Sequence, residues 1–273
     1  MRANTQLPYL IAGVHDVHVA LSAAHVQQIV KVPVWHVVPH QPTHYRGLID
    51  FRGRTIPLLD LRLRMGMTSA LAEADAMIAM LNAREQDHVR WLEALERAVR
   101  DGEAFTLARD PTKCAFGKWF YSYNATDLGF RSVMGQFELP HRVIHGIADA
   151  ALDFVAAGHR DRAIELIDRT RHGELRQVRA LFSDAREAYL NSRNELAVVL
   201  MAGAALFAVT VDRVASCETL DEEASDDTRS LLGGFRSDCV STVFRRRNDR
   251  GLAYLLEPSQ LLASAEVALA ATA

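Results

Sequence analysis

Apolar residues change their spacing twice along the chain, and these changes divide the sequence into three regions. Up to about residue 70, short apolar runs alternate with Gly, Pro, Asp and Arg, the breaks expected between β-strands. From about 70 to 192 these breaks nearly vanish, and apolar residues recur with the period of an amphipathic helix. Short apolar runs return from about residue 194. This order predicts an α+β chain in which a helical domain interrupts a β domain at a surface loop, where insertions are tolerated.

Three stretches of the β regions predict particular elements. The run "GLIDFRGRTIPLLDL" (47–61) predicts a hairpin with its turn at 52–54. The run "LAVVLMAGAALFAVTV" (196–211) predicts two buried strands joined at "AGA". It is shorter than the roughly 20 residues of a membrane-spanning helix, and Gly203 interrupts it, so no membrane insertion is expected. The stretch "AAHVQQIVKV" (23–32) predicts a short helix leading into a strand.

The central region predicts four amphipathic helices, which pack most naturally as an antiparallel bundle. The first covers about 74–100. The second begins with Asp110 as N-cap and Pro111 at the first helical position, both favoured there. The third runs from Pro140 to about residue 157 and the fourth over about 161–190.

Histidines lie on the apolar stripes of the first and third predicted helices. His141 and His145 are one helical turn apart and so share a face, and His88 lies on the stripe of the first helix. A single such histidine is more often a packed core residue than a ligand. Here, however, Cys114 joins them near the start of a helix, where the dipole and free N–H groups favour a thiolate. Three imidazoles and one thiolate form a complete tetrahedral set for zinc.

The order and spacing of these residues resemble the chemoreceptor zinc-binding (CZB) domain. That family has a lone early His, a Cys-x-x-Gly-x-aromatic box and a late His-x-x-x-His pair on a four-helix bundle. Here the box is "CAFGKW", with Gly117 and Trp119 in place, and the resemblance covers about residues 75–190. It implies four zinc ligands: His88, Cys114, His141 and His145. It also implies that Gly117 allows close helix packing and that Trp119 fills the core.

The four-ligand set argues against a zinc enzyme. A hydrolytic zinc keeps one coordination position for water and has a carboxylate nearby as general base. In zinc proteases a Glu follows the first His, whereas Arg142 stands there in this chain. The zinc is therefore expected to be structural or regulatory. A Cys-ligated site loses affinity when its sulfur is oxidised, so sensing of zinc or of an oxidant is chemically feasible. The CZB resemblance implies the regulatory use.

The two β regions together resemble the CheW-type chemotaxis coupling domain. The residues that carry the resemblance are "HYRGLIDFRGRTIPLLDLRLRMGM" (44–67), "LFAVTVDRVASCETL" (206–220) and "GLAYLLEPSQLLAS" (251–264). The resemblance implies a double five-stranded β-barrel domain with a shared core, interrupted by the inserted four-helix bundle. The expected boundaries are 1–70 for the first CheW-like part, 71–193 for the CZB insert and 194–273 for the second CheW-like part.

Domains of the CheW type have no catalytic residues and bridge a CheA-type histidine kinase and the cytoplasmic tips of chemoreceptors. The residues that align with the family's contact region are Val26, Gln28, Ile29 and Arg52. Many relatives have an acidic residue at the position of Gln28, able to pair with the arginine at the position of Arg52. The neutral Gln28 therefore suggests altered partner choice or weaker kinase coupling. The alternatives are solvated hairpin charge for Arg52 and ordinary core packing for Val26 and Ile29.

Charge and cysteine content narrow the remaining classes. The net charge is −3 and basic residues are spread along the chain, which argues against nucleic acid as a partner. Three cysteines, far apart, predict no disulfide framework and fit a reducing cytoplasm. The leading interpretation is a non-enzymatic cytoplasmic signalling adaptor with a zinc-binding insert, which can also form a homodimer through that insert. The alternatives are a scaffold or dimerisation module with structural zinc and, third, a zinc hydrolase.

Overall fold

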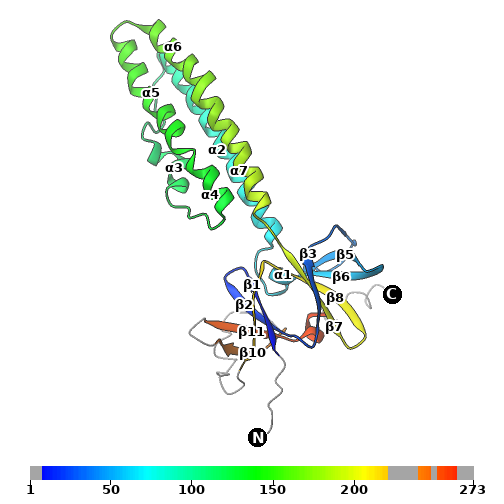
Figure 1. Ribbon diagram of the computed structural model, residues 1–273. Helices are drawn as coiled ribbons and strands as arrows, with labels where there is room; N and C mark the ends of the chain where they lie inside the picture. Colours follow the sequence, from blue (N-terminus) through cyan, green and yellow to red (C-terminus); the bar gives the residue numbers. More distant parts are fainter. Residues whose placement is uncertain (1–7, 221–238, 247–250, 263–273) are drawn as a thin grey trace. The chain divides into compact units, whose positions relative to one another are not determined.

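The computed structural model describes residues 8–220, 239–246 and 251–262 (Figure 1). The chain divides into two compact units. We call residues 1–70 together with 194–273 the β unit, and residues 71–193 the helical unit. The chain thus leaves the β unit once and returns to it once.

The β unit contains two sheets and a short helix. The first sheet has the order β10-β11-β2-β1-β9, with β1 (Tyr9–Val14), β2 (Val17–Ser22), β9 (Arg213–Glu218), β10 (Val240–Arg245) and β11 (Leu252–Leu256). The second has the order β3-β7-β8-β6-β5-β4, with β3 (Val26–Lys31), β4 (Trp35–His36), β5 (Tyr45–Phe51), β6 (Arg54–Asp60), β7 (Leu196–Ala202) and β8 (Ala205–Val211). Helix α1 (Leu61–Arg64) follows β6. The mixed α+β class is confirmed.

The predicted pair of five-stranded barrels differs from the strand pairing of the described residues. One sheet has five strands and the other six, and the pairings among residues 8–220, 239–246 and 251–262 close neither into a barrel. The sixth strand is β4, a two-residue edge strand that pairs with β5. Pro33 and Pro39 flank it, and proline cannot donate to a sheet ladder, so β4 stays short.

Both predicted strand pairs form. The hairpin β5–β6 turns at Arg52 (φ 53°) and Gly53 (φ 75°), two left-handed positions that match the twist of antiparallel strands. Strands β7 and β8 turn at Gly203 (φ 58°). The predicted helix in 23–32 is wrong, because β3 pairs with the buried strand β7 and tertiary pairing overrides the local preference of this segment.

Strands on either side of the helical unit lie next to each other. Strand β6 pairs in parallel with β8, with Leu58 opposite Ala208 and Asp60 opposite Thr210. The apolar core between them draws on both segments, including Leu59, Val198 and Phe207. The β unit is therefore assembled from residues about 150 positions apart.

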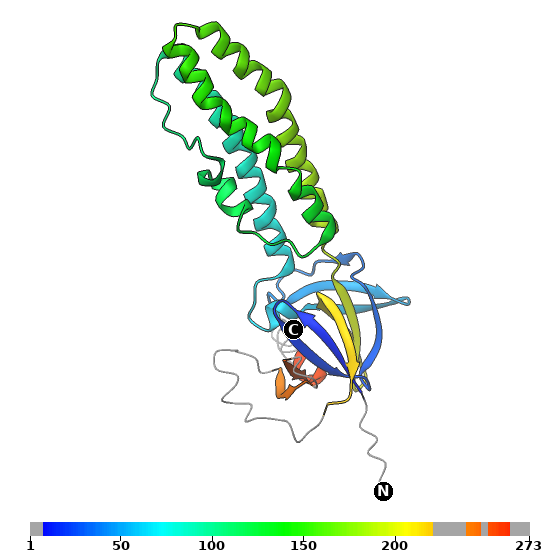
Figure 2. The same ribbon diagram turned by 60° about the vertical axis from the view of Figure 1, so that its left-hand side comes forward.

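Within the helical unit, three long helical segments pack with shorter ones (Figure 2). The long segments are α2 (Ala70–Asp101), α5 (Glu138–Ala156), and α6 (Arg160–Thr170) continued by the π-helical turn η2 (Arg171–Leu175) and α7 (Arg176–Asn191). The short ones are the 3₁₀ turn η1 (Pro111–Lys113), α3 (Ala115–Phe120) and α4 (Leu128–Gly135). No helix of the described residues is both long enough and apolar enough to cross a membrane.

The predicted second helix is divided. Asp110 caps it and Pro111 begins it, as expected, but the turn stops at Cys114, whose backbone is extended (φ −69°, ψ 162°). Cys114 then caps α3, and Asp127 caps α4. The space expected for one helix therefore contains a 3₁₀ turn and two short helices, so three long segments rather than four line the core.

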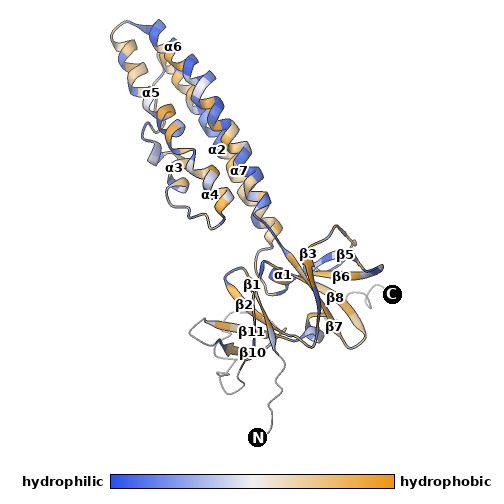
Figure 3. Cartoon of the chain, in the orientation of Figure 1, coloured by the Kyte–Doolittle hydropathy of each residue, from blue (hydrophilic) through white to orange (hydrophobic). Residues whose placement is uncertain are grey.

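Each long helix presents an apolar and a polar face (Figure 3). The apolar faces meet in a core that includes Leu81, Leu95 and Phe182, all fully buried. Ion pairs tie α2 to α7 beside this core: buried Glu85 contacts Arg179 at 3.2 Å and Arg186 at 2.8 Å.

Candidate metal centre

The four residues proposed from sequence as zinc ligands meet inside the helical unit. His88 comes from α2, Cys114 from the start of α3, and His141 and His145 from α5. One potential ligand atom from each lies within 4.8 Å of all the others. The three imidazoles are at most 3% exposed, and Cys114 is half-buried. We refer to these four residues as the His/Cys cluster.

Gly117 determines how the segment before α3 folds back on the helix. Its N–H donates to the Cys114 sulfur at 3.1 Å. A Cβ at this position would lie 1.8 Å from the carbonyl oxygen of Pro111. Only glycine fits here, and the close approach that it allows is to the preceding 3₁₀ turn; the predicted close packing against another helix stays a prediction. Trp119, the aromatic residue of the box, is partly buried, packs on the core and stacks on Tyr123, away from the cluster.

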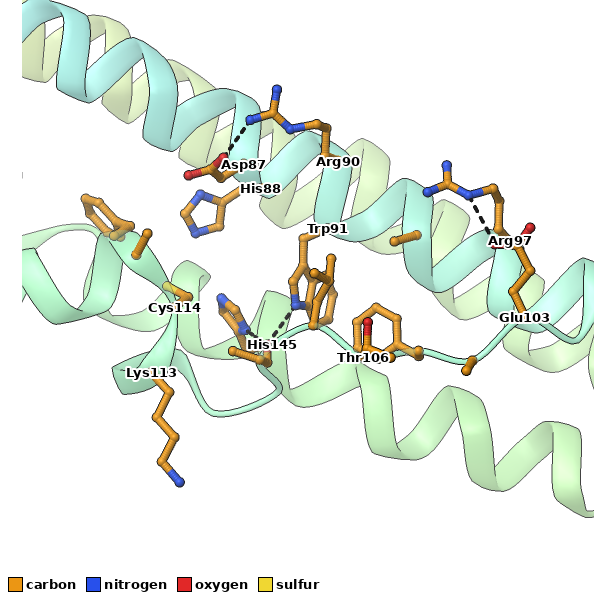
Figure 4. A pocket seen from close by; sticks show the side chains of 17 residues that line it. Asp87, His88, Arg90, Trp91, Arg97, Glu103, Thr106, Lys113, Cys114 and His145 are labelled. Atoms are coloured by element: carbon orange, nitrogen blue, oxygen red, sulfur yellow. Dashed lines mark hydrogen bonds and ion pairs between the residues drawn. The ribbon is translucent and has the colours of Figure 1, made fainter.

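Two imidazoles are oriented by backbone carbonyls. The Nδ1–H of His88 donates to the carbonyl of Arg84 at 2.7 Å. That of His145 donates to the carbonyl of Ala108 at 3.0 Å (Figure 4). A carbonyl only accepts, so each ring must carry its proton on Nδ1 and present the lone pair of Nε2. Carbonyl partners of this kind typically orient metal-binding histidines.

The atoms that these two rings present lack partners among the described residues. Nε2 of His88 and Nε2 of His145 are buried without a hydrogen bond, as is Nδ1 of His141. A buried polar atom left unsatisfied costs about 1–3 kcal/mol. The other nitrogen of His141, Nε2, lies 3.3 Å from the Cys114 sulfur. A metal ion bound by the cluster would satisfy the lone pairs on Nε2 of His88 and Nε2 of His145, which have no partner among the described residues, so these residues fit a zinc ion.

The environment keeps the histidines neutral. Burial, with the nearby imidazoles of the cluster, lowers the pKa of His141 to about 3 and that of His145 to about 4. Burial also lowers the pKa of His88. Neutral imidazole is the form that binds metal.

The Cys114 thiol is subject to opposing effects. Burial raises its pKa, while the backbone N–H groups of Gly117 and Phe116 act in the opposite direction. The expectation that the helix start favours the thiolate is therefore right in direction, but burial outweighs it in the metal-free protein. Metal binding would displace the thiol proton.

The donors of the cluster are three imidazoles and one thiol, with no carboxylate among them. Arg142, which stands where a zinc protease has its glutamate, is exposed and pairs with Glu138 at 3.8 Å. The buried Glu85 is held by two arginines of α7. Such a set can close a tetrahedral site.

Two contributors to the cluster were not foreseen from sequence. The carbonyl of Ala108 accepts both from His145 and from Nε1–H of Trp91, the latter at 2.8 Å. A backbone carbonyl in a loop has no residue signature, so no pattern could reveal it. The hydrogen bond from His88 to the Arg84 carbonyl could have been predicted from the sequence, because Arg84 lies one helical turn before His88.

Three of the four residues expected at a partner surface lie on β3, and Arg52 lies in the β5–β6 turn of the same sheet. Arg52 donates to the side-chain oxygen of Gln28 at 2.6 Å, so the neutral residue still pairs with the arginine. Val26 packs partly against the core, in line with the packing alternative. Ile29 is 37% exposed, so ordinary core packing does not account for it.

Two family models match parts of the chain. A family model described as the CheW-like domain matches residues 8–94, and one described as the chemoreceptor zinc-binding domain matches residues 88–152. All four residues of the His/Cys cluster lie within the second match. The crystal structure of the scaffolding protein TtCheW from Thermoanaerobacter tengcongensis aligns at 9% identity with a TM-score of 0.45, over 96% of this chain and 90% of that one. No curated protein matches the chain.

Proposed function

We propose that this chain, which carries a CheW-like domain followed by a chemoreceptor zinc-binding domain, is a non-enzymatic cytoplasmic adaptor. It couples chemoreceptors to a CheA-type histidine kinase, and zinc in the helical unit modulates that coupling. The two domain matches support a chemotaxis signalling adaptor with a zinc-binding module. The single observation that carries the regulatory part is the His/Cys cluster, buried in a unit that interrupts the β unit.

The zinc ligands in this proposal are the four residues of the cluster. Nε2 of His88 and Nε2 of His145 are oriented by backbone carbonyls and lack partners among the described residues, which supports them as donors. The contact between His141 and the Cys114 sulfur places the remaining two side chains together. Zinc bound there would link α2, α3 and α5, and its loss would loosen the core between them.

The β unit corresponds in this proposal to a complete CheW-like domain in two parts, 1–70 and 194–273. The parallel pairing of β6 with β8 supports this assignment. So does Arg62 of α1, which donates to the carboxylate of Asp212 beyond β8 at 3.0 and 2.8 Å. We assign the two sheets to the two barrel-like lobes of that fold, and 71–193 to the CZB bundle, with α3 and α4 in the place of a fourth helix.

The modulation rests on how the helical unit is connected. Residues 65–69 connect it to α1 and residues 192–195 connect it to β7, so a change in the spacing of α2 and α7 would act on both connections. The return connection is firmly held within the β unit: buried Arg46 binds Glu195 at 2.9 Å and lies over the Trp35 ring. Because Glu195 is fixed to Arg46, a displacement of residue 193 would also displace the six-stranded sheet.

The partner surface in this proposal comprises Val26, Gln28, Ile29 and Arg52. The exposure of Ile29 and the pairing of Gln28 with Arg52 support a contact that combines an apolar strip with a positive charge.

The test combines metal analysis with partner binding. The purified chain should contain one zinc, and His141→Ala and Cys114→Ala should lose it; zinc well below one per chain in the unmutated protein would refute the site. Pull-down of a CheA-type kinase and of a receptor cytoplasmic fragment is then compared with and without a chelator. A change in binding on metal removal supports regulation.

A scaffold or dimerisation module with structural zinc is the second candidate. The apolar residues Leu139 and Val143, one turn apart on α5 and 72% and 36% exposed, favour a homodimer through the helical unit. Partner binding that is unchanged by the chelator, in a protein that stays folded and dimeric by light scattering, would favour this candidate.

A further inference from the structure

A cavity of about 620 Å³ opens beside the His/Cys cluster. It lies between α2 and the segment 103–116, as Figure 4 shows. Its apolar lining includes Trp91, Ala94 and Phe105, and charged side chains of Arg90 and Lys113 stand at its border.

The cavity reaches three of the four cluster residues. His88, Cys114 and His145 line it, and His141 does not. His141 is fully buried, and its ring packs edge-on against Phe116, with centroids 5.1 Å apart. A molecule in the cavity therefore meets three potential metal ligands, while the fourth lies behind them in the core.

The outer wall of the cavity is tied to the cluster. The carbonyl of Ala108 holds Trp91 through Nε1–H and His145 through Nδ1–H at once. Phe105 packs edge-on against Trp91, with centroids 5.2 Å apart. The width of the cavity and the orientation of His145 thus depend on the same loop.

The border of the cavity carries charges of both signs. Arg90 pairs with Asp87 at 2.6 Å, and Arg97 faces Glu103 at 3.6 Å. A cavity opening with charges of both signs repels neither a hydrated cation nor a small anionic chelator. An opening lined only by positive charges would repel the cation, and one lined only by negative charges would repel the chelator.

We propose that zinc enters and leaves the cluster through this cavity, and that a small chelating molecule exchanges the metal there. The proposal rests on the zinc assignment made above. His88, Cys114 and His145 would hold the metal on the side that the cavity reaches, where a donor atom of the chelator would replace them one at a time, and a released Cys114 thiolate would take a proton from solvent. His141 would hold it from the side away from the cavity.

Two substitutions with opposite effects on the cavity test this path. Ala94→Phe narrows it, and Phe105→Ala widens it and frees Trp91 from its edge contact. Zinc release from the full chain is followed by stopped-flow absorbance with 4-(2-pyridylazo)resorcinol as the acceptor. We expect release to be about tenfold slower for Ala94→Phe and about tenfold faster for Phe105→Ala, corresponding to barrier changes of about 1.4 kcal/mol in opposite directions.

Ala79→Phe is the matched control, because Ala79 lies on the same helix, is exposed and does not line the cavity. It should release zinc at the rate of the unmutated protein. The equilibrium zinc affinity, measured by competition, should stay within about threefold for Ala94→Phe and Ala79→Phe, since both leave the ligands and the loop that orients His145 unchanged. For Phe105→Ala, which lies in that loop, the affinity should change by less than the release rate.

The inference fails if both cavity variants release zinc at the unmutated rate, or if their affinities change in proportion to their rates. Phe105→Ala keeps the test decisive if Ala94→Phe does not fold. If the unmutated protein binds no zinc, the proposed function and this inference fail together. If it binds one zinc and the rates do not respond, only the path is refuted.

Discussion

Replacing Gly117 by alanine adds one methyl group at the tightest point of the proposed zinc site. The new Cβ would lie 1.8 Å from the Pro111 carbonyl oxygen, whereas real Cβ atoms stay at least 3.0 Å from their neighbours. The 3₁₀ turn must therefore move away from α3 by roughly 1 Å. Overpacking of this kind lowers the free energy of unfolding by about 1–3 kcal/mol.

The displacement also acts on the ligand next to it. Gly117 donates to the Cys114 sulfur, and Cys114 directly follows the turn that must move. Loss of an interaction that orients a ligand typically weakens metal binding by about 10–100-fold. Gly117→Ala is therefore expected to bind zinc at least about tenfold more weakly than the unmutated chain.

Gly146→Ala is the matched control. Gly146 follows His145 on α5, is exposed, and a Cβ there would meet nothing within 4 Å. Alanine is the better helix former, so this substitution should raise the free energy of unfolding by about 0.5–1 kcal/mol and leave zinc binding unchanged.

Urea denaturation in the presence of a chelator measures the packing effect alone, and competition with a zinc dye measures the affinity. The two substitutions should change stability in opposite directions. A Gly117→Ala protein as stable as the unmutated chain, with the same zinc affinity, would show that the turn is not held where the structure has it.

Three further predictions concern charge. The pKa values of His141 and His145 lie below the ordinary value of about 6.5, so below that pH the unfolded state binds more protons than the folded state. The free energy of unfolding of the metal-free protein should therefore be lower at pH 5 than at pH 7 by about 2 kcal/mol for each histidine. Urea denaturation curves with the same midpoint at both pH values would contradict this. Glu85→Gln, which removes the charge between two arginines, should lower the free energy of unfolding by about 1–2 kcal/mol. The same change at Glu138, whose side chain is 45% exposed, should stay within about 0.5 kcal/mol, and equal effects in denaturation would refute the role of burial. Arg52→Ala should weaken kinase or receptor pull-down about tenfold with unchanged zinc content, and full binding would exclude Arg52 from the partner surface.

Local rules explain which parts of the helical unit were predictable. The apolar period identified α2 and α5 to within a few residues, and the Asp110–Pro111 pair marked the start of the second element. The same rules did not foresee the break at Cys114, because the close approach of Gly117 to Pro111 arises only when the chain folds back on itself. In the β unit, the turns at Gly53 and Gly203 were predictable for the same local reason, whereas the strand β3 depends on pairing with β7.

The sequence by itself determined that His141 and His145 share a helix face, since spacing along one helix needs no partner. It also indicated, through the resemblance to a known motif, which two residues would join them. Only the tertiary structure decided that His88 and Cys114 reach that face, and that the Ala108 carbonyl orients His145 while His141 lies behind the cavity. The physical reason is that these relations join segments tens of residues apart, and their distances are set by how the helices pack and not by any local backbone preference.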